Sequence, residues 1–405
     1  MLSIQNLTYL QSGITLFQQS NLQIYPNQRI GLVGHNGSGK TTLLRILENY
    51  AKQKGLKAAF FDLEQPQILA DFNRPDKEIA QIISGAGEVI FIDEFQYVRN
   101  ISKIFKAIFD SKKKIKIICS GSSSLEIHKH LKESLAGRRF LYRIYPLEYS
   151  EIRNSYPDFT FEDYLRFGGM PGLTHTDAKE RKQQILNELV GSYILKDIKS
   201  LVKEENIRAF NHLLYLLAQN QGSTISVHSL SAEVGLSSKA INRYLDILEQ
   251  TYVNYRIYSY SKNLGNELKK SCKTYLYDLG VRNMLLKDFS AIASRPDKGV
   301  ILESFVFLKL QAMLAPNMEI KFWRTKDGGE VDFILLKDRI PIPIEVKSKI
   351  ISSEIPSGLK RFLARYPDVK LAYIINEEIE QDISYGDCRI HLATFEKFSE
   401  DFQIE

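Results

Sequence analysis

The chain has 405 residues, 44% hydrophobic and 25% charged, which is typical of a folded globular protein and excludes disordered and collagen-like classes. At roughly 100 to 200 residues per domain, this length predicts two or three domains. No apolar run approaches the roughly 20 residues that span a bilayer, and the start lacks the features of a signal peptide. We therefore predict a cytoplasmic protein with no membrane partner. Three widely spaced cysteines suggest neither a disulfide framework nor a zinc site, and a net charge of +6 alone does not argue for a polyanion partner.

Short strands are predicted at 3–9, 22–25 and 29–33, because apolar residues roughly alternate along each of them. The pattern G-x-x-x-x-G-K-[ST] follows the third strand and precedes a helical run at 43–47. Its glycines let backbone N–H groups surround phosphate oxygens, Lys40 can reach the terminal phosphates, and Thr41 can ligate Mg²⁺. The predicted site for ATP and Mg²⁺ comprises Gly34, His35, Asn36, Gly37, Ser38, Gly39, Lys40, Thr41 and Thr42. A glycine-rich turn that holds no nucleotide is the alternative.

The opening of the chain, up to and including this pattern, resembles that of ABC-type ATPases. In that family an aromatic residue before the P-loop stacks on the adenine, and Tyr9 stands at the matching position. A tyrosine that packs on a small sheet is the alternative. The resemblance then ends, because no Leu-Ser-Gly-Gly-Gln signature occurs and the interval before the next acidic strand is too short for the subdomain that carries it.

That acidic strand lies at 88–96, an apolar run that ends in two carboxylates, as in a buried parallel strand. Asp93 is predicted to hold the Mg²⁺, and Glu94 to orient and deprotonate the attacking water. A strand that merely ends in a polar turn is the alternative. The next apolar run, at 116–123, ends in small hydroxyl residues, of which we choose Ser122 as a sensor of the γ-phosphate. Capping of the following helix, at 125–131, is the other interpretation.

Several segments in a fixed order resemble AAA-type prokaryotic ATPases that carry a C-terminal domain of unknown function. These segments are 60–64, 92–96, 121–123, 135–139, 145–151 and 167–171. The resemblance implies a P-loop parallel sheet and self-association, in a homo-oligomeric ring whose arginine touches the neighbour's γ-phosphate. Arg138 is our candidate for that arginine, with Arg139 beside it; a plain surface arginine is the alternative for either. The family's arginine-rich phrase before the P-loop is absent here, which leaves the adenine contacts open.

A helical connector is predicted at 152–205, followed at 206–262 by a winged helix. The second module has a helix at 207–219, a helix–turn–helix spacing with Gly235 in the turn, and an alternating strand at 252–260. A set of residues near the start of its second helix would reach DNA. They are Ser237, Ser238, Lys239, Asn242 and Arg243. Few of them are basic, and a packing or protein-contact module is the alternative.

The last domain is predicted at 263–405, entered through a charged run at 269–273 that we interpret as solvated. A helix near Gly299 is followed by a hairpin at 329–348, and residues two apart on a strand share a face. This resembles the PD-(D/E)XK nuclease core, in which two carboxylates hold Mg²⁺ and a lysine acts on the water or the phosphate. The matching residues are Glu303, Asp332, Glu345 and Lys347, with Val331 in place of the family's proline. A solvent-facing Glu–Lys pair without cleavage is the alternative.

The overall prediction is an α/β P-loop ATPase at 1–151, a winged-helix module, and an α+β restriction-endonuclease-like domain. It comprises binding and hydrolysis of ATP with Mg²⁺ by Lys40, Thr41, Asp93 and Glu94. A separate hypothesis, which rests on the two later modules, couples this turnover to nucleic-acid binding or processing, with a second Mg²⁺ or Mn²⁺ as a candidate ligand of the last domain. Two rivals remain: a nucleotide-dependent DNA- or protein-binding switch with an inactive nuclease-like domain, and an ABC-like transport subunit, which the missing signature disfavours.

Overall fold

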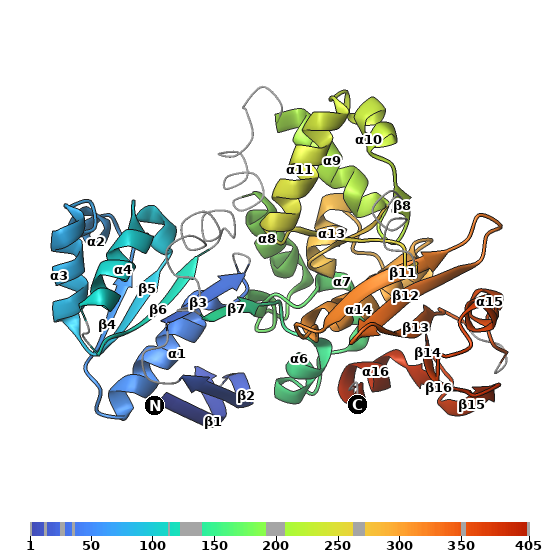
Figure 1. The fold of residues 1–405 in the computed structure, drawn as a ribbon, viewed down its shortest axis with the longest axis horizontal. Coiled ribbons are helices and arrows are strands. Elements are labelled where there is room, and N and C mark those ends of the chain that lie inside the picture. The colour runs from blue at the N-terminus through green and yellow to red at the C-terminus, as the bar shows by residue number, and fades with distance from the viewer. Residues whose placement is uncertain are drawn as a thin grey trace. The chain divides into compact units, whose positions relative to one another are not determined.

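The computed structural model describes residues 2–11, 14–24, 29–34, 37–111, 114–121, 140–191, 207–261, 272–349 and 354–402. They belong to two compact units, the first comprising Met1–Pro146 with Gln250–Tyr252 and the second Leu147–Glu249 with Val253–Glu405. Each unit combines helices with a β-sheet (Figure 1). Among the described helices, none is both long and apolar enough to cross a membrane.

The first unit is built on a five-stranded parallel sheet. Its strands are β3 (Arg29–Gly34), β4 (Ala58–Asp62), β5 (Val89–Asp93), β6 (Lys116–Gly121) and β7 (Phe140–Ile144), in the order β4-β5-β6-β3-β7. All four strand pairs are parallel. The predicted strand that ends in carboxylates is β5, and β6 separates it from β3. Because parallel strands end at one edge, the chain segments that follow β3, β5 and β6 emerge side by side.

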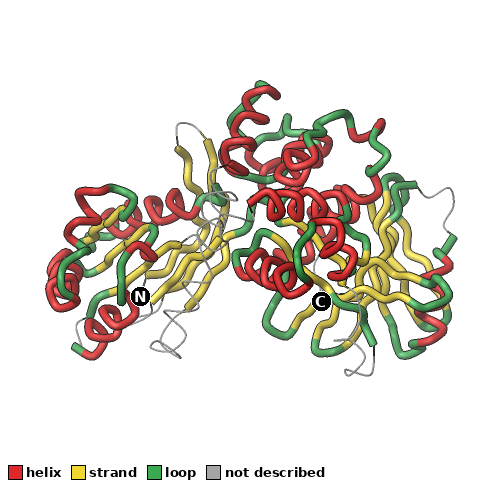
Figure 2. The backbone as a smooth tube through the Cα atoms, turned by 90° about the horizontal axis from the view of Figure 1, so that it is seen from above, coloured by secondary structure: helices red, strands yellow, loops and turns green. Residues whose placement is uncertain are grey.

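Helices cover both faces of this sheet (Figure 2). They are α1 (Lys40–Gln53), α2 (Pro66–Asp71), α3 (Asp76–Ala86) and α4 (Ile101–Asp110), with a short 3₁₀ helix, η1 (Phe95–Tyr97). Side chains of β5 alternate between two cores: Val89 and Phe91 pack with α1, whereas Ile90 and Ile92 pack with α3 and α4. A strand buried on both faces is a continuous apolar run, which is why the sequence pattern of β5 is recognisable.

A separate antiparallel hairpin precedes the sheet. It consists of β1 (Leu2–Gln11) and β2 (Ile14–Ile24), with irregular register between Ile4 and Leu10. Both strands are longer than the predicted segments 3–9 and 22–25. The difference is largest for β2, which extends through a stretch whose polar residues break the alternation of apolar and polar residues.

The second unit begins with helices and a small sheet. The helices are α6 (Tyr149–Ser155), α7 (Phe161–Phe167), η2 (Pro171–Leu173), α8 (Lys179–Leu189), α9 (Ile207–Gln219), α10 (Val227–Val234) and α11 (Ser238–Gln250). The strands β8 (Thr224–Ile225), β9 (Asn254–Ile257) and β10 (Cys272–Leu276) form an antiparallel sheet in the order β8-β10-β9. Thus β10, which the sequence analysis assigns to the last domain, is the central strand of the small sheet that also contains β8 and β9.

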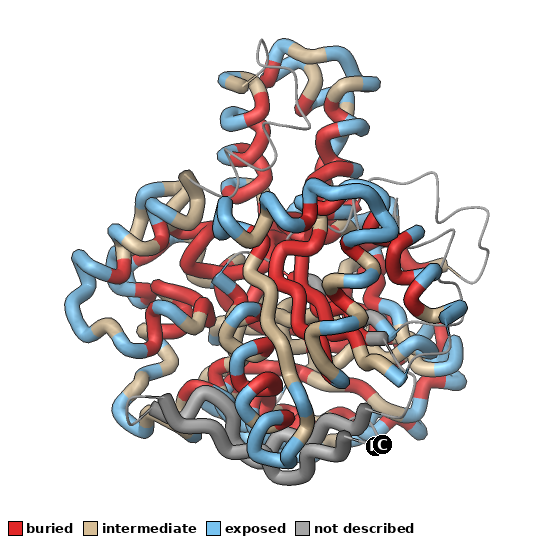
Figure 3. The backbone as a smooth tube through the Cα atoms, turned by 90° about the vertical axis from the view of Figure 1, so that its left-hand side faces the viewer, coloured by how far each residue is buried: buried red, intermediate tan, exposed pale blue. Residues whose placement is uncertain are grey.

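A six-stranded mixed sheet completes the second unit. Its strands are β11 (Met318–Arg324), β12 (Glu330–Lys337), β13 (Ile340–Val346), β14 (Leu371–Asn376), β16 (Cys388–Thr394) and β15 (Gln381–Tyr385), in that spatial order. The accompanying helices are α13 (Leu279–Leu286), η6 (Ile292–Ser294), α14 (Lys298–Ala312), α15 (Ser357–Arg365) and α16 (Phe395–Asp401). Buried residues gather in the strands and on the inner sides of helices (Figure 3). In the core of the six-stranded sheet, Trp323 packs edge-on against Phe362.

The motif at 167–171 interlocks with the start of α13. The Asp278 carboxylate accepts hydrogen bonds from the amides of Gly169 at 2.8 Å and Val281 at 2.9 Å. A Cβ at Gly168, whose φ is +75°, would lie 2.3 Å from both Asp278 oxygens. Only glycine fits there, since a side chain would both strain the backbone and strike the carboxylate. Burial raises the pKa of Asp278 to about 6, against the effect of the amides that it accepts from.

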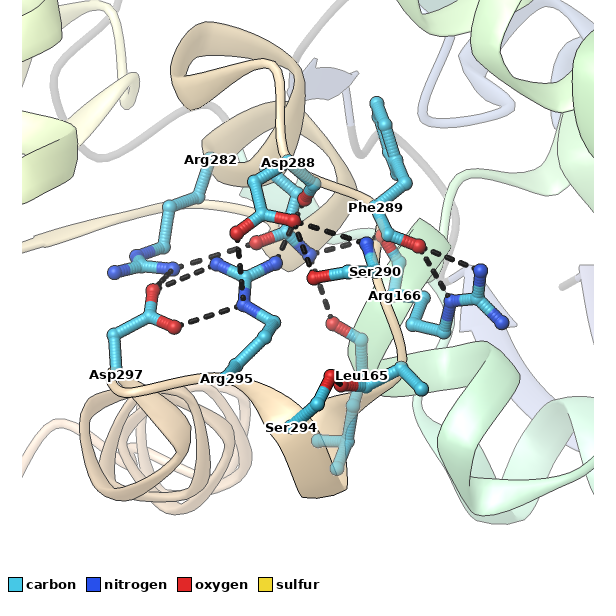
Figure 4. Close-up of polar contacts among 11 residues, drawn as sticks. Leu165, Arg166, Arg282, Asp288, Phe289, Ser290, Ser294, Arg295 and Asp297 are labelled. Atoms are coloured by element: carbon cyan, nitrogen blue, oxygen red, sulfur yellow. Dashed lines mark hydrogen bonds and ion pairs between the residues drawn. The ribbon is translucent and has the colours of Figure 1, made fainter.

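A buried charge network holds the chain between α13 and α14 (Figure 4). Asp297 pairs with Arg282 at 2.8 Å and with Arg295 at 2.6 Å, and both arginine side chains are 1% exposed. Arg166 on α7 donates to the Phe289 carbonyl from two nitrogens, at 2.9 and 2.5 Å. Although burial opposes ionisation, the two arginines lower the pKa of Asp297 to about 2. The network therefore ties Asp297, the residue before α14, to Arg282 on α13 and to Arg295.

We expect Asp297→Ala to lower the free energy of unfolding by about 3 to 5 kcal/mol, because it leaves buried Arg282 and Arg295 without their shared carboxylate. Chemical denaturation measures this. The loss should shrink as pH falls from about 4 to about 2, since a carboxylate with a lowered pKa stabilises the fold only above its unfolded pKa. The control is Asp387→Ala, which removes an exposed pair with Lys370 and should cost about 1 kcal/mol or less. Equal losses in the two variants would contradict the network's role.

Candidate functional site

The first candidate site lies at the carboxyl edge of the parallel sheet. β3 ends at Gly34 and leads through the loop into α1, whereas β5 ends at Asp93 and β6 at Gly121. In open α/β sheets, ligands bind in the crevice outside this edge. The topology therefore brings the P-loop and the acidic strand end to the same place.

Glycine geometry shapes the described part of the loop. Gly37 and Gly39 have φ of 84° and 88°, in the left-handed region that other residues avoid. Gly39 is the N-cap residue of α1, and the amide groups at a helix N-terminus favour binding of an anion. A Cβ at Gly34 would lie 2.3 Å from the Ile144 carbonyl oxygen on β7, so the strand end tolerates no side chain.

Lys40 opens α1 and is buried, with 4% of its surface exposed. Its ammonium donates to the Gly34 carbonyl at 2.6 Å, across the loop. The positive charge of Lys40 is thus held at the end of β3, where the loop begins.

The acids at the end of β5 are also buried. Ser120, on β6, donates its hydroxyl to Asp93 Oδ1. Glu94 has φ of 53°, an unusual backbone conformation for a non-glycine residue, and Gln96 donates to its carboxylate. Burial raises the pKa of Glu94, and the charge of Lys40 opposes that rise, so the loop lysine and this acid act on each other. Asp93 and the Thr41 hydroxyl offer the oxygen ligands that Mg²⁺ prefers, and the residues present therefore fit a Mg²⁺–nucleotide complex.

Comparison with known families agrees with this arrangement. Residues 26–153 match the model of an AAA domain. The chain carries an AAA-type P-loop ATPase domain. Residues 158–291 and 298–395 match two domains of unknown function, DUF8612 and DUF4143. The resemblance to AAA-type ATPases with a C-terminal domain of unknown function is thus confirmed.

Proteins of similar sequence fall into two groups, one that matches most of the chain and one that matches only part of it. An uncharacterized protein of Mycobacterium tuberculosis is 27% identical over 345 residues, covering 84% of this chain and 74% of its own. An energy-coupling factor transporter ATP-binding protein of Aster yellows witches'-broom phytoplasma is 49% identical over 117 residues, but covers only 26% of this chain and 43% of its own. The replication initiator DnaA, bound to AMPPCP and single-stranded DNA, has a TM-score of 0.31 at 17% identity, covering 55% of this chain and 82% of its own. A score this low carries no further inference.

Several predicted residues of the AAA domain lie outside the described part of the chain. They are His35, Asn36, Ser122, Arg138 and Arg139. Tyr9 belongs to β1, but its side chain is likewise outside the description. Among the described members, Ser38 is buried, Thr42 is half-buried and Thr41 is exposed on the first turn of α1. The sequence analysis overlooked Ser120, two residues before the predicted sensor; its position at the end of an apolar run was the available signal.

The second unit holds the other predicted cluster, and its acids lie together. Asp332 Oδ2 accepts from the Val346 amide at 2.8 Å, and Lys347 donates to Glu345 Oε1 at 2.6 Å. Glu345 is 4% exposed, and its Oε2 is buried without a hydrogen-bond partner. Burial and the charge of Asp332 raise the pKa of Glu345 to about 8, against the influence of Lys347.

Lys273 is the member that the sequence analysis missed. Its ammonium lies 2.8 Å from Glu330, 3.1 Å from Glu303 and 3.9 Å from Asp332. Its side chain is 2% exposed, although the charged run that contains it was predicted to be solvated. Tyr275, two residues on, donates to Glu303 at 2.5 Å. No sequence pattern signals that a strand of the small sheet contributes to this cluster.

The group formed by Glu303, Glu330, Asp332 and Glu345, called the acidic cluster below, is not arranged as a typical metal site. Burial and Asp332 raise the pKa of Glu303 to about 7, even with Lys273 beside it. Within the described residues, no three His, Cys, Asp or Glu side chains are placed to hold a metal ion. Among the described residues the structure thus shows no metal site for the predicted second Mg²⁺ or Mn²⁺.

The five residues predicted to contact DNA lie on α11 and at the turn before it. Ser237 accepts from the Ala240 amide at 3.2 Å, and Asn242 donates to the Ser238 carbonyl at 3.0 Å. Gly235 ends α10 with φ of 75°, as the tight turn requires. All five predicted contact residues are exposed, including Lys239 and Arg243.

We expect Gly34→Ala to abolish ATP binding, because the added Cβ would meet the Ile144 carbonyl at 2.3 Å and displace the loop. Fluorescence titration with a labelled ATP analogue measures the dissociation constant. The control is Gly85→Ala on α3, where nothing lies within 4 Å of the added Cβ and alanine favours the helix. Unchanged affinity in folded Gly34→Ala protein would refute the assigned loop geometry.

Proposed function

We propose that this protein hydrolyses ATP with Mg²⁺ and couples the turnover to nucleic-acid binding through its C-terminal modules. The observation that carries the proposal is that Lys40 follows β3 and Glu94 follows β5 at the same edge of a parallel sheet, and that both residues are buried there. An AAA domain with a buried acid beside its P-loop lysine has the parts for hydrolysis of a phosphoanhydride.

Each side chain has a distinct role in this proposal. Lys40 turns from the Gly34 carbonyl to the terminal phosphates and offsets the charge that develops there. Glu94 accepts a proton from the attacking water, and its raised pKa brings it closer to the operating pH of a general base. Thr41 and Asp93 would hold Mg²⁺, which supplies charge neutralisation at the phosphates. Ser120 keeps the Asp93 carboxylate oriented.

The nucleic-acid part rests on two modules of the second unit. The order α9-β8-α10-α11-β9-β10, with β10 central in its sheet, is the arrangement expected of a winged helix. The order α14-β11-β12-β13-α15-β14 follows the PD-(D/E)XK core that the sequence resembles. In the first module, α11 would enter the major groove and Lys239 and Arg243 would contact phosphates.

A nucleotide-dependent binding switch with an inactive nuclease-like domain is the second candidate. It is favoured by Lys273, whose ammonium lies among the acids that cleavage would require.

Lys40→Ala should lower the rate of ATP hydrolysis by about 100-fold or more, the cost of removing one charge-stabilising group. Glu94→Gln should retain ATP binding but lower the rate of hydrolysis by a similar factor. In the wild type the rate should rise with pH above the ordinary carboxyl range, because Glu94 must be deprotonated to act as a base and its pKa is raised; this rise should be absent in the variant. Phosphate release measures both. The control is Lys52→Ala, an exposed lysine of the same helix. Hydrolysis by Lys40→Ala at the wild-type rate would reject the ATPase assignment.

Replacement of Lys239 and Arg243 together by alanine should weaken binding to duplex DNA and reduce the salt dependence by about one unit of log–log slope per lost phosphate contact. Fluorescence anisotropy with a labelled duplex, at several salt concentrations, measures both quantities. Lys103→Ala with Lys106→Ala, on exposed positions of α4, removes the same charge and serves as the control. If the two double variants bind DNA alike, α11 is not the contact helix.

A further inference from the structure

Lys273 lies at the centre of the acidic cluster of the second unit. Its Nζ is within 3.1 Å of carboxylate oxygens from both Glu303 and Glu330, and within 3.9 Å of Asp332. These acids come from α14 and β12, whereas the lysine comes from β10 of the small sheet. One ammonium thus lies close to three carboxylates from two elements and offsets their negative charge, as a bound metal cation would.

Most of the other contacts of the carboxylate oxygens in this cluster are hydrogen bonds from groups of the protein. Glu303 Oε1 also accepts from Tyr275, and Asp332 Oδ2 accepts from the Val346 amide. Lys347 takes Glu345 Oε1. Glu345 Oε2 is the buried oxygen that keeps its lone pairs unused. A cation needs several such oxygens, and here most of them already have a donor.

A divalent ion and the Lys273 ammonium would compete for the same oxygens. Mg²⁺ binds oxygen at about 2.0 to 2.1 Å. An ion bound to Glu303 Oε1 or Asp332 Oδ1 would lie close to an ammonium that is 3.1 Å from the first oxygen and 3.9 Å from the second. Two cations so close, in a buried site, repel each other strongly.

We propose that Lys273 is an internal cation that takes the place of a divalent metal in the acidic cluster, so that the cluster is held together without metal and does not cleave nucleic acid. This inference rests on the proposed nuclease-like character of the domain, and it denies that domain a cutting role. Lys273 is then the residue that separates this chain from an active nuclease of the same architecture.

The test counts Mn²⁺ ions bound by the full-length protein without nucleotide, using electron paramagnetic resonance or calorimetry. Wild type and Glu345→Gln should bind the same number, since the acidic cluster of the wild type holds no metal. Lys273→Met should gain about one ion per chain, and its melting temperature should rise with Mn²⁺. The double variant Lys273→Met, Glu345→Gln should lose that gain.

The control is Lys321→Met, which removes another buried lysine of the same unit, paired with the exposed Glu319. It should gain no Mn²⁺. The proposal is overturned if the Lys273→Met variant folds and binds no more Mn²⁺ than the wild type. If Lys273→Met does not fold, the wild type is compared with two other variants. The proposal is overturned if Glu345→Gln binds one ion fewer than the wild type, or if the wild type shows metal-dependent DNA cleavage that Asp332→Ala abolishes. It is supported if neither result is obtained. ATP hydrolysis is measured separately, so a failed ATPase assignment remains distinguishable.

Discussion

A charge removed from water must meet its partner inside the protein, and this constraint organises both units. In the first unit, buried Lys40 and Glu94 influence each other across the sheet edge, and Asp93 is held by a serine hydroxyl. In the second, Arg282 and Arg295 share Asp297. Desolvation of an unpaired ion costs several kcal/mol, so each partner has to be positioned accurately. The geometry of the sites follows from that requirement.

The second unit is a single body for the same reason. β10 pairs with β8 and β9 and also supplies Lys273 and Tyr275 to acids of α14 and β12. Gln221 and Gly222, in the turn after α9, reach the same helix: Ser304 donates to Gln221 at 2.7 Å, and a Cβ at Gly222 would lie 3.0 Å from Glu303. The module that contains α11 and the domain that carries the acidic cluster therefore share polar contacts and not merely a linker.

Local patterns in the sequence predict the P-loop, the acidic strand β5, the helix–turn–helix and the hairpin of β12 and β13, because each depends on residues close in the chain. The P-loop glycines and Lys40 are recognisable for this reason. The positions of Lys273 and Arg282 cannot be recognised in this way, since their partners lie 15 to 59 residues away and a charged residue in a sequence is normally solvated. Ser120 illustrates a nearer miss: the strand was predicted, but the hydroxyl that faces Asp93 depends on β6 lying beside β5. Gly168 depends likewise on a carboxylate 110 residues later.

Trp323 has a practical consequence. The chain contains one tryptophan, and this residue is 3% exposed within the core of the six-stranded sheet. Its emission depends on contact with Phe362 and on exclusion of water. Intrinsic fluorescence excited at the indole band therefore follows melting of the six-stranded sheet without a contribution from the ATPase unit, and comparison with circular dichroism can reveal whether the two units lose structure in one step or in two.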